Sequence, residues 1–313
     1  MGQPWFQRLL LFLFVLVAAS VFDLRETTLG EALAPAIGDP AESGFLGRIA
    51  IGAVLGGALV LNVALLQLLP FVPRIGVVWA ELLIFFLAFF HSFDLSYPFI
   101  LDRLPFMVFQ GAFTTIYVSM ASILLACVLA LIAALGKLSD SGMAYGISTF
   151  YISFFRGTPL LLQVYLIYLG LPQLGFYVDA VPAGITALCL CYGAYMAEIF
   201  RAGILGVPRG QTEAAMALGI KTGVIFRKII FPQAMKLIVP PTGNQFIAML
   251  KDSALISVMG VWELMFLART QGRSEFKHIE MMIAAAMIYW AMSIVFELIQ
   301  ARIERHYGKS EIR

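Results

Sequence analysis

The sequence predicts an all-α integral membrane protein with about eight transmembrane helices, and three observations support this prediction. Hydrophobic residues make up 61% of the 313 residues, and the mean hydropathy is +0.90. Charged residues make up 13%, whereas a soluble domain carries about 25%. The apolar residues also gather in runs close to the ~20 residues that cross a hydrocarbon core.

Two of the eight predicted spans, the first and the fourth, differ from a simple transmembrane helix. The first resembles the core of a signal peptide, because Arg8 precedes it and small residues end it, but it exceeds the ~7–15 residues typical of such cores. We therefore expect a retained first helix, with cleavage as the alternative. The fourth span is too long for one straight crossing, so it either begins in the membrane interface or tilts as one overlong helix. The spans lie near residues 5–22, 49–71, 74–93, 105–136, 150–172, 179–204, 238–267 and 281–302.

The distribution of Lys and Arg predicts the orientation, because cytoplasmic segments are enriched in both. If the N-terminus is inside and the spans alternate, fourteen of the 21 basic residues lie on the inner side and six on the outer side, with Lys251 left within a span. Both termini and the segment 206–232 are then cytoplasmic. The chain also divides in two, since residues 1–96 hold three spans and residues 97–313 hold five.

Several classes of function are disfavoured. A net charge of +2 argues against binding of nucleic acid, which needs a concentrated basic face. The three cysteines lie in apolar runs and the three histidines are scattered, so we expect no metal site, redox pair or catalytic residue. The sequence contains no G-x-x-x-x-G-K-[ST] phosphate loop, so we expect this chain to bind no cofactor and to hydrolyse no ATP itself.

The segment 206–232 is a long polar stretch between two apolar runs. Pro208 can open a helix and Thr212 is an acceptable N-cap. Glu213 would then lie in the first turn, where its charge suits the helix dipole. An alanine-rich run follows, so we expect a short helix that another protein can approach closely. An ordinary helix lying on the membrane surface is the alternative.

The end of this segment also has recognisable helix signals. Gly219 permits a left-handed turn that ends the first helix. A second helical stretch, 224–231, precedes Pro232, which is expected to close it. A rigid helix held between two such breaks would transmit a push, whereas a flexible loop would absorb it.

The spacing of these residues resembles the EAA loop of ABC importer permeases. The matching positions are Glu213-Ala214-Ala215, Gly219, Ile229 and Pro232, while Phe231 stands where the family usually has leucine. In that family the loop is a coupling helix seated in a groove of a cytoplasmic ATPase. The resemblance implies that the residues coupled to the ATPase are Gly210, Thr212, Glu213, Ala214, Ala215, Gly219 and Pro232.

Three further segments resemble the polar amino acid branch of that family, namely 155–160 with Gln163, 193–203, and 251–255 followed by Gly260 and Glu263-Leu264. The resemblance covers residues 105 to 305 and implies a five-helix type I permease core, preceded by a three-helix extension. It implies four partners: a dimeric cytoplasmic ABC ATPase that carries ATP and Mg²⁺, a second permease subunit, an external solute-binding protein and an amino acid substrate. It also implies residence among the lipids of a bacterial cytoplasmic (inner) membrane.

Polar groups inside the spans are the candidates for a translocation path or gate. A charge at membrane depth costs about 2.5–3.5 kcal/mol, and it usually faces a protein interior or a water-filled path. The alternative is a buried network that locks helices together. The candidates are Arg156, Gln163, Glu198, Gln245, Lys251 and Asp252.

The spacing of these groups restricts how they pair. Lys251 and Asp252 are adjacent, so on a helix they point about 100° apart and each needs another partner, for which we consider Glu198 or Arg156. Glu198 and Arg201 lie three residues apart on one face and can pair with each other.

A helix start is expected shortly after Arg156, which we place at the cytoplasmic interface. Thr158 can cap this helix and Pro159 would occupy its first turn.

These features predict the permease subunit of an ATP-driven importer of polar amino acids. A secondary transporter driven by an ion gradient is the first alternative, with Lys251, Asp252 and Glu198 as relay groups. A membrane scaffold that transports nothing is the second alternative.

Overall fold

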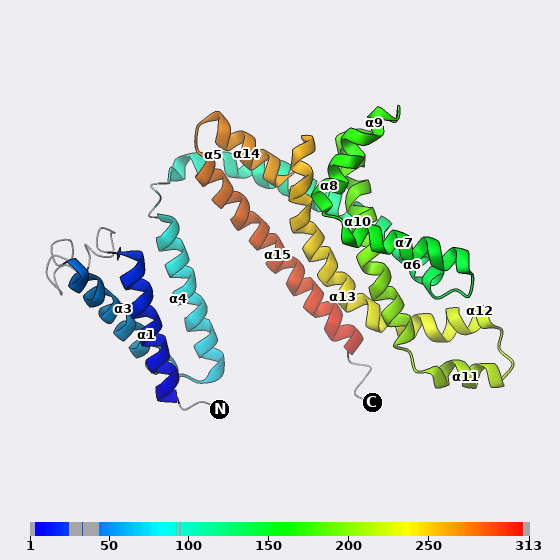
Figure 1. Cartoon of the computed structure of the whole chain (residues 1–313), viewed down its shortest axis with the longest axis horizontal. Coiled ribbons are helices and arrows are strands. Elements are labelled where there is room, and N and C mark those ends of the chain that lie inside the picture. Colours follow the sequence, from blue (N-terminus) through cyan, green and yellow to red (C-terminus); the bar gives the residue numbers. More distant parts are fainter. Residues whose placement is uncertain (1–3, 25–32, 34–43, 92, 94, 309–313) are drawn as a thin grey trace. The chain divides into compact units, whose positions relative to one another are not determined.

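The computed structural model describes residues 4–24, 33, 44–91, 93 and 95–308, and all regular elements in these residues are helices (Figure 1). Six helices are long and apolar enough to cross a membrane, and two bent pairs bring the number to eight if each pair is one span. The predicted all-α membrane fold is confirmed. The predicted orientation rests in part on Arg25, Lys309 and Arg313, which lie outside the described residues.

The chain divides into two compact units, Met1–Asp94 and Leu95–Arg313. The first unit holds α1 (Pro4–Phe22), α3 (Gly44–Leu66) and α4 (Phe71–His91). Helix α3 ends earlier than predicted because the chain turns before Pro70. The Arg74 guanidinium donates to the carbonyl oxygens of Gln67 at 3.1 Å and Leu69 at 2.6 Å, and so satisfies this turn.

Two glycines allow α1 and α3 to pack closely. A Cβ on Gly52 would lie 3.0 Å from the Leu16 Cα, and a Cβ on Gly56 would lie 2.9 Å from the Phe12 ring. Glycines four residues apart let helix backbones approach each other in a membrane. The carboxylate inside α4, Glu81, has its partner on α3, because the Asn62 amide donates to it at 2.9 Å.

The second unit begins with one uninterrupted helical stretch of 41 residues, Tyr97–Lys137. It consists of α5 (Tyr97–Phe106), the π-helical segment η2 (Met107–Ala112) and α6 (Phe113–Lys137). The helix therefore starts eight residues before the predicted span, and the π turn lies where polar and small residues interrupt the apolar run.

The apolar span predicted near 150–172 is bent, and the helix start predicted shortly after Arg156 is confirmed. Helix α7 (Gly142–Gly157) ends at a 107° bend, and α8 (Leu160–Tyr165), η3 (Leu166–Gly170) and α9 (Leu171–Gln173) follow. Thr158 has extended backbone angles, φ −106° and ψ 143°, and ends α7 instead of capping the next helix. Pro159 takes the N-cap position of α8. A proline ring clashes with a helical residue before it, which explains the break.

Helix α10 (Ala180–Leu205) is the most buried span and packs chiefly against α6. Gly193 allows this close packing, because a Cβ on it would lie 3.2 Å from the Leu129 Cβ of α6 and 2.6 Å from the Tyr151 hydroxyl of α7. The remaining elements are α11 (Arg209–Ala217), α12 (Thr222–Ile225), η4 (Phe226–Ile230), α13 (Phe231–Asp252), η5 (Ser253–Met259), α14 (Leu264–Ser274) and α15 (His278–Gly308).

The predicted span 238–267 is also broken. The chain leaves η5 at Gly260, whose φ of +80° favours glycine, and α14 begins after a 50° bend. Helices α13 and α15 lie side by side, and α14 packs on α15 (Figure 1). Apolar residues of these three helices, including Leu250, Leu264 and Met281, form a second core together with Met107 and Ala112 of η2.

Replacement of Gly52 by leucine tests the close packing of α1 and α3. We expect Gly52→Leu to lower the free energy of unfolding by about 1–3 kcal/mol, the usual cost of overpacking, as measured by titration with sodium dodecyl sulfate in mixed micelles. Gly57→Leu is the matched control, because no atom lies within 4 Å of a Cβ at that position. Equal losses in both variants would show that the contact is not specific.

Candidate functional site

Helices α11 and α12 form a hairpin that projects from the ends of α10 and α13 (Figure 1). The first helix of this hairpin ends as predicted. Gly219 has a φ of +73°, the Ile220 N–H donates to the Ala215 carbonyl oxygen at 3.1 Å, and the Gly219 N–H donates to that of Met216 at 2.9 Å. These two bonds define a Schellman motif, which holds the end of α11 rigidly.

The start of the hairpin differs from the prediction. Helix α11 begins at Arg209 with Pro208 in the N-cap position, so Thr212 is a helical residue and not the N-cap. Glu213 consequently lies beyond the first turn. A proline with ψ near 130° can occupy an N-cap position because this residue is not itself helical. Gly210 is exposed, with no atom within 4 Å of a Cβ built on it.

The prediction that Pro232 closes the second helix is wrong. It lies at the start of α13, and the helical path continues through it from Thr222 to Asp252. The π turn Phe226–Ile230 directly precedes it. A proline inside a helix is tolerated where a local π turn accommodates the missing N–H.

The alanines of α11 divide between two faces. Ala215 is 3% exposed and belongs to the same buried apolar cluster as Ile225 and Ile230, a cluster that continues into α6 and α10. Glu213 and Ala214 are exposed, and Leu218 at the end of the helix is 79% exposed. The structure therefore places Ala215 where it holds α11 on α12, while its neighbours form the free face.

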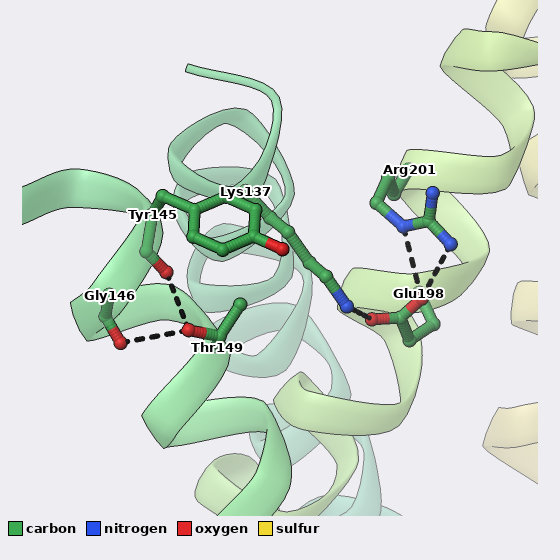
Figure 2. Close-up of polar contacts among 6 residues, drawn as sticks. All are labelled: Lys137, Tyr145, Gly146, Thr149, Glu198 and Arg201. Carbon is green, nitrogen blue, oxygen red and sulfur yellow. Dashed lines mark hydrogen bonds and ion pairs between the residues drawn. The ribbon is translucent and has the colours of Figure 1, made fainter. Parts of the chain in front are cut away.

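An ionic cluster joins the last turn of α6 to the C-terminal part of α10 (Figure 2). The Lys137 ammonium lies 2.5 Å from Glu198 Oε1, and the Arg201 guanidinium donates two bonds of 3.0 Å to Glu198 Oε2. One carboxylate thus serves two cations, and Lys137 also sits favourably at a helix C-terminus. The predicted Glu198–Arg201 pair is confirmed, and Lys137 is the partner that sequence reasoning missed.

Gln163 bridges the break between α7 and α8. Its buried side chain amide donates to the carbonyl oxygens of Phe155 at 2.9 Å and Thr158 at 3.0 Å, and to the Thr158 hydroxyl at 2.9 Å. Arg156, on the same break, stacks over the Tyr195 ring of α10 with 5.3 Å between guanidinium carbon and ring centroid. Both residues therefore hold the bend in place.

Asp252 and Lys251 find different surroundings from those considered above. The Tyr192 hydroxyl of α10 donates to Asp252 Oδ2 at 2.7 Å, so neither Glu198 nor Arg156 is its partner. Lys251 points to a cavity beside α15. Gln245 is half-buried in α13, and among the described residues its side chain makes no hydrogen bond.

Glu263 is the buried centre of the second break. Its side chain is fully buried and accepts hydrogen bonds from the N–H groups of Met265 at 2.8 Å and Phe266 at 2.7 Å, and from the Tyr289 hydroxyl at 2.8 Å. The Thr115 hydroxyl of α6 accepts from the Leu264 N–H at 3.2 Å. A carboxylate at an N-cap is a recognisable sequence signal, but the break at Gly260 that creates this cap was not predicted.

Comparison with known proteins places these features in context. Residues 126–309 match the model of a family described as binding-protein-dependent transport system inner membrane component. The arginine transport system permease protein ArtQ of Bacillus subtilis is 36% identical over 68% of this chain and 97% of its own length. The probable amino-acid ABC transporter permease protein PatM of Vibrio harveyi is also 36% identical, over 71% of this chain and 100% of its own length.

Solved structures agree with this match. A crystal structure of an amino acid ABC transporter with histidines superimposes with a TM-score of 0.64 and 36% identity, over 68% of this chain and 99% of that chain. The similarity covers about two thirds of the sequence printed here.

Removal of the shared carboxylate tests the ionic cluster. We expect Glu198→Gln to lower the free energy of unfolding by about 1–3 kcal/mol, since Lys137 and Arg201 would lose their charged partner and repel each other. The measurement is thermal unfolding in detergent. Glu213→Gln is the matched control, because Glu213 is exposed and has no ion pair among the described residues. An unchanged midpoint for Glu198→Gln would contradict the assignment.

Proposed function

Because the chain belongs to the family of binding-protein-dependent transport system inner membrane components, we propose that it carries polar amino acids inward and is driven by a separate ATPase that docks on α11. It is the permease subunit of an amino acid ABC transporter, and in this proposal the partner subunit hydrolyses the ATP. The observation that carries the docking proposal is the rigid hairpin of α11 and α12, whose free face has no partner within the described chain.

The free face of α11 has the composition of a protein contact. Met216 and Leu218 are exposed beside the small side chain of Ala214, on a hairpin that projects from the bundle. Exposed apolar side chains surrounded by polar ones commonly mark a docking surface. Small residues allow close approach, and Glu213 adds a charge at its centre. We propose that these residues, with Gly210 and Thr212, meet the ATPase.

The same hairpin is connected directly to the helices that carry the polar groups. Only Gly206–Pro208 separate α10 from α11, and α12 continues through the π turn into α13. A displacement of α11 would therefore be transmitted to Glu198 on α10 and to Asp252 on α13. In this proposal, closure of the ATPase dimer on ATP and Mg²⁺ moves both helices and changes which side of the membrane the path faces.

The remaining partners follow from the architecture and the family. A five-span core is small for enclosing a polar route, so a second permease subunit, identical or related, would complete it. A solute-binding protein would deliver the amino acid at the end of the bundle opposite α11. The proposed orientation puts both termini and the segment 206–232 in the bacterial cytoplasm, with lipid around the exposed apolar faces.

Gly219→Leu tests the coupling role. A leucine at φ +73° costs about 1–2 kcal/mol of backbone strain and would misplace the end of α11. In proteoliposomes that contain the complete transporter and its binding protein, we expect ATP-dependent uptake of L-arginine, suggested by the ArtQ relative, to fall at least about tenfold. Basal ATP hydrolysis should persist.

Gly223→Leu is the matched control for this experiment. Gly223 lies in α12 with no atom within 4 Å of a Cβ and has an ordinary helical backbone, so uptake should be retained. Should no amino acid of a full panel be taken up with ATP, or should uptake follow a proton or sodium gradient without nucleotide, the secondary-transporter alternative would replace this proposal.

A further inference from the structure

A cavity of about 530 Å³ lies among α13, α14 and α15 and is lined by charges of both signs. Lys251 reaches it from the end of α13, and Glu297 reaches it from α15. Cavities of this size hold small molecules in other proteins. The cavity is distinct from the α11–α12 hairpin and from the Glu198 cluster.

The two charges are not paired. Among the described residues, neither the Lys251 ammonium nor the Glu297 carboxylate has a hydrogen bond or an ion pair within 4.0 Å, although both line one cavity. Both side chains are exposed on this chain and belong to helices of candidate membrane spans, where an unpaired charge facing lipid is costly. Glu198 and Glu263, by contrast, each accept several hydrogen bonds. Lys251 and Glu297 are therefore free to bind a group from outside the chain.

A third polar group faces the same cavity. Ser293 is 7% exposed, and its hydroxyl oxygen is buried without a hydrogen-bond partner. It lies one helical turn before Glu297, so both side chains share a face of α15. A buried hydroxyl without a partner carries a free-energy cost, which a bound ligand would remove.

The rest of the wall is apolar. Met265, Met282 and the rings of Tyr289 and Trp290 line the cavity next to the charged groups. The Tyr289 hydroxyl is already engaged with Glu263, so its ring and not its hydroxyl is available. The cavity thus combines one cationic, one anionic and one hydroxyl group with an adaptable apolar wall.

We infer that this cavity binds the zwitterionic end of an α-amino acid, with the substrate carboxylate on Lys251 and its ammonium on Glu297. The inference rests on the proposed transport function and adds the site and the atoms recognised. A lone cation or a lone anion would leave one of the two protein charges unpaired, whereas a zwitterion neutralises both. Ser293 supplies a further hydrogen bond, and the apolar wall contacts the stem of the substrate side chain.

The inference is tested with the complete transporter in detergent, without ATP. Thermal shift measurements with each of the twenty proteinogenic L-amino acids identify the amino acid that stabilises most. Its decarboxylated amine and its des-amino acid then serve as probes, since each lacks one of the two recognised groups. We expect both analogues to bind about tenfold to a hundredfold more weakly than the amino acid, the range for loss of one charge-assisted hydrogen bond.

Two variants make the assignment of each group specific. In Lys251→Met the amino acid and its decarboxylated amine should bind equally, because the partner of the carboxylate is gone. In Glu297→Gln the amino acid and its des-amino acid should bind equally. Lys236→Met on α13 and Glu280→Gln on α15 are the controls, because neither residue lines the cavity, and both should keep the full discrimination.

The double variant Lys251→Met/Glu297→Gln separates this site from a simple ion pair. If the two residues only attract each other, the double variant will recover what each single variant loses. If they only contact a second permease subunit, the losses will add, and in both cases the single variants will keep the discrimination among analogues. That result, or the absence of a shift with every amino acid, overturns the inference. ATP-driven uptake with unchanged discrimination would overturn it while leaving the proposed transport function intact.

Discussion

The permease core depends on one constraint, which is that backbone groups freed by a broken helix must find partners where lipid offers none. Two of its spans are broken, at Thr158–Pro159 and at Gly260–Glu263. At the first break the Gln163 amide donates to two carbonyl oxygens. At the second, the Glu263 carboxylate and the Thr115 hydroxyl accept three backbone N–H groups. At each break, side chains thus form the hydrogen bonds that the interrupted helix leaves unmade.

The breaks also create the features that function needs. The bend after α7 places Arg156 over the Tyr195 ring, which ties the bend to the central helix α10. The bend before α14 turns the chain so that α14 packs on α15. The charged cavity among α13, α14 and α15 exists because of this second bend. A bundle of straight helices would have neither the bends held by Gln163 and Glu263 nor this cavity.

The sequence was sufficient for the features that depend on local physics. Hydrophobic runs predicted the membrane helices, and Gly219 predicted the left-handed end of α11. Two elements were misplaced around prolines. Pro232 was predicted to end a helix, although the π turn before it carries the helical path through, and Thr158 was predicted to cap a helix, although Pro159 forces it to be extended. Partners such as Tyr192 for Asp252 lie 60 residues apart, and neither spacing nor charge counting could bring them together.

The distribution of partners among the intramembrane charges separates structural from functional groups. Glu198 and Asp252 carried the expectation of a relay or path, yet each is held by a fixed partner in this fold. The hydrogen bonds and ion pairs of such a carboxylate offset its desolvation cost, so a structural role is sufficient to explain its presence. Lys251 and Glu297 have no hydrogen-bond or ion-pair partner within the described chain. In the proposed site one amino acid zwitterion binds both of these exposed charges at once, which gives Lys251 and Glu297 a role that packing within the chain does not.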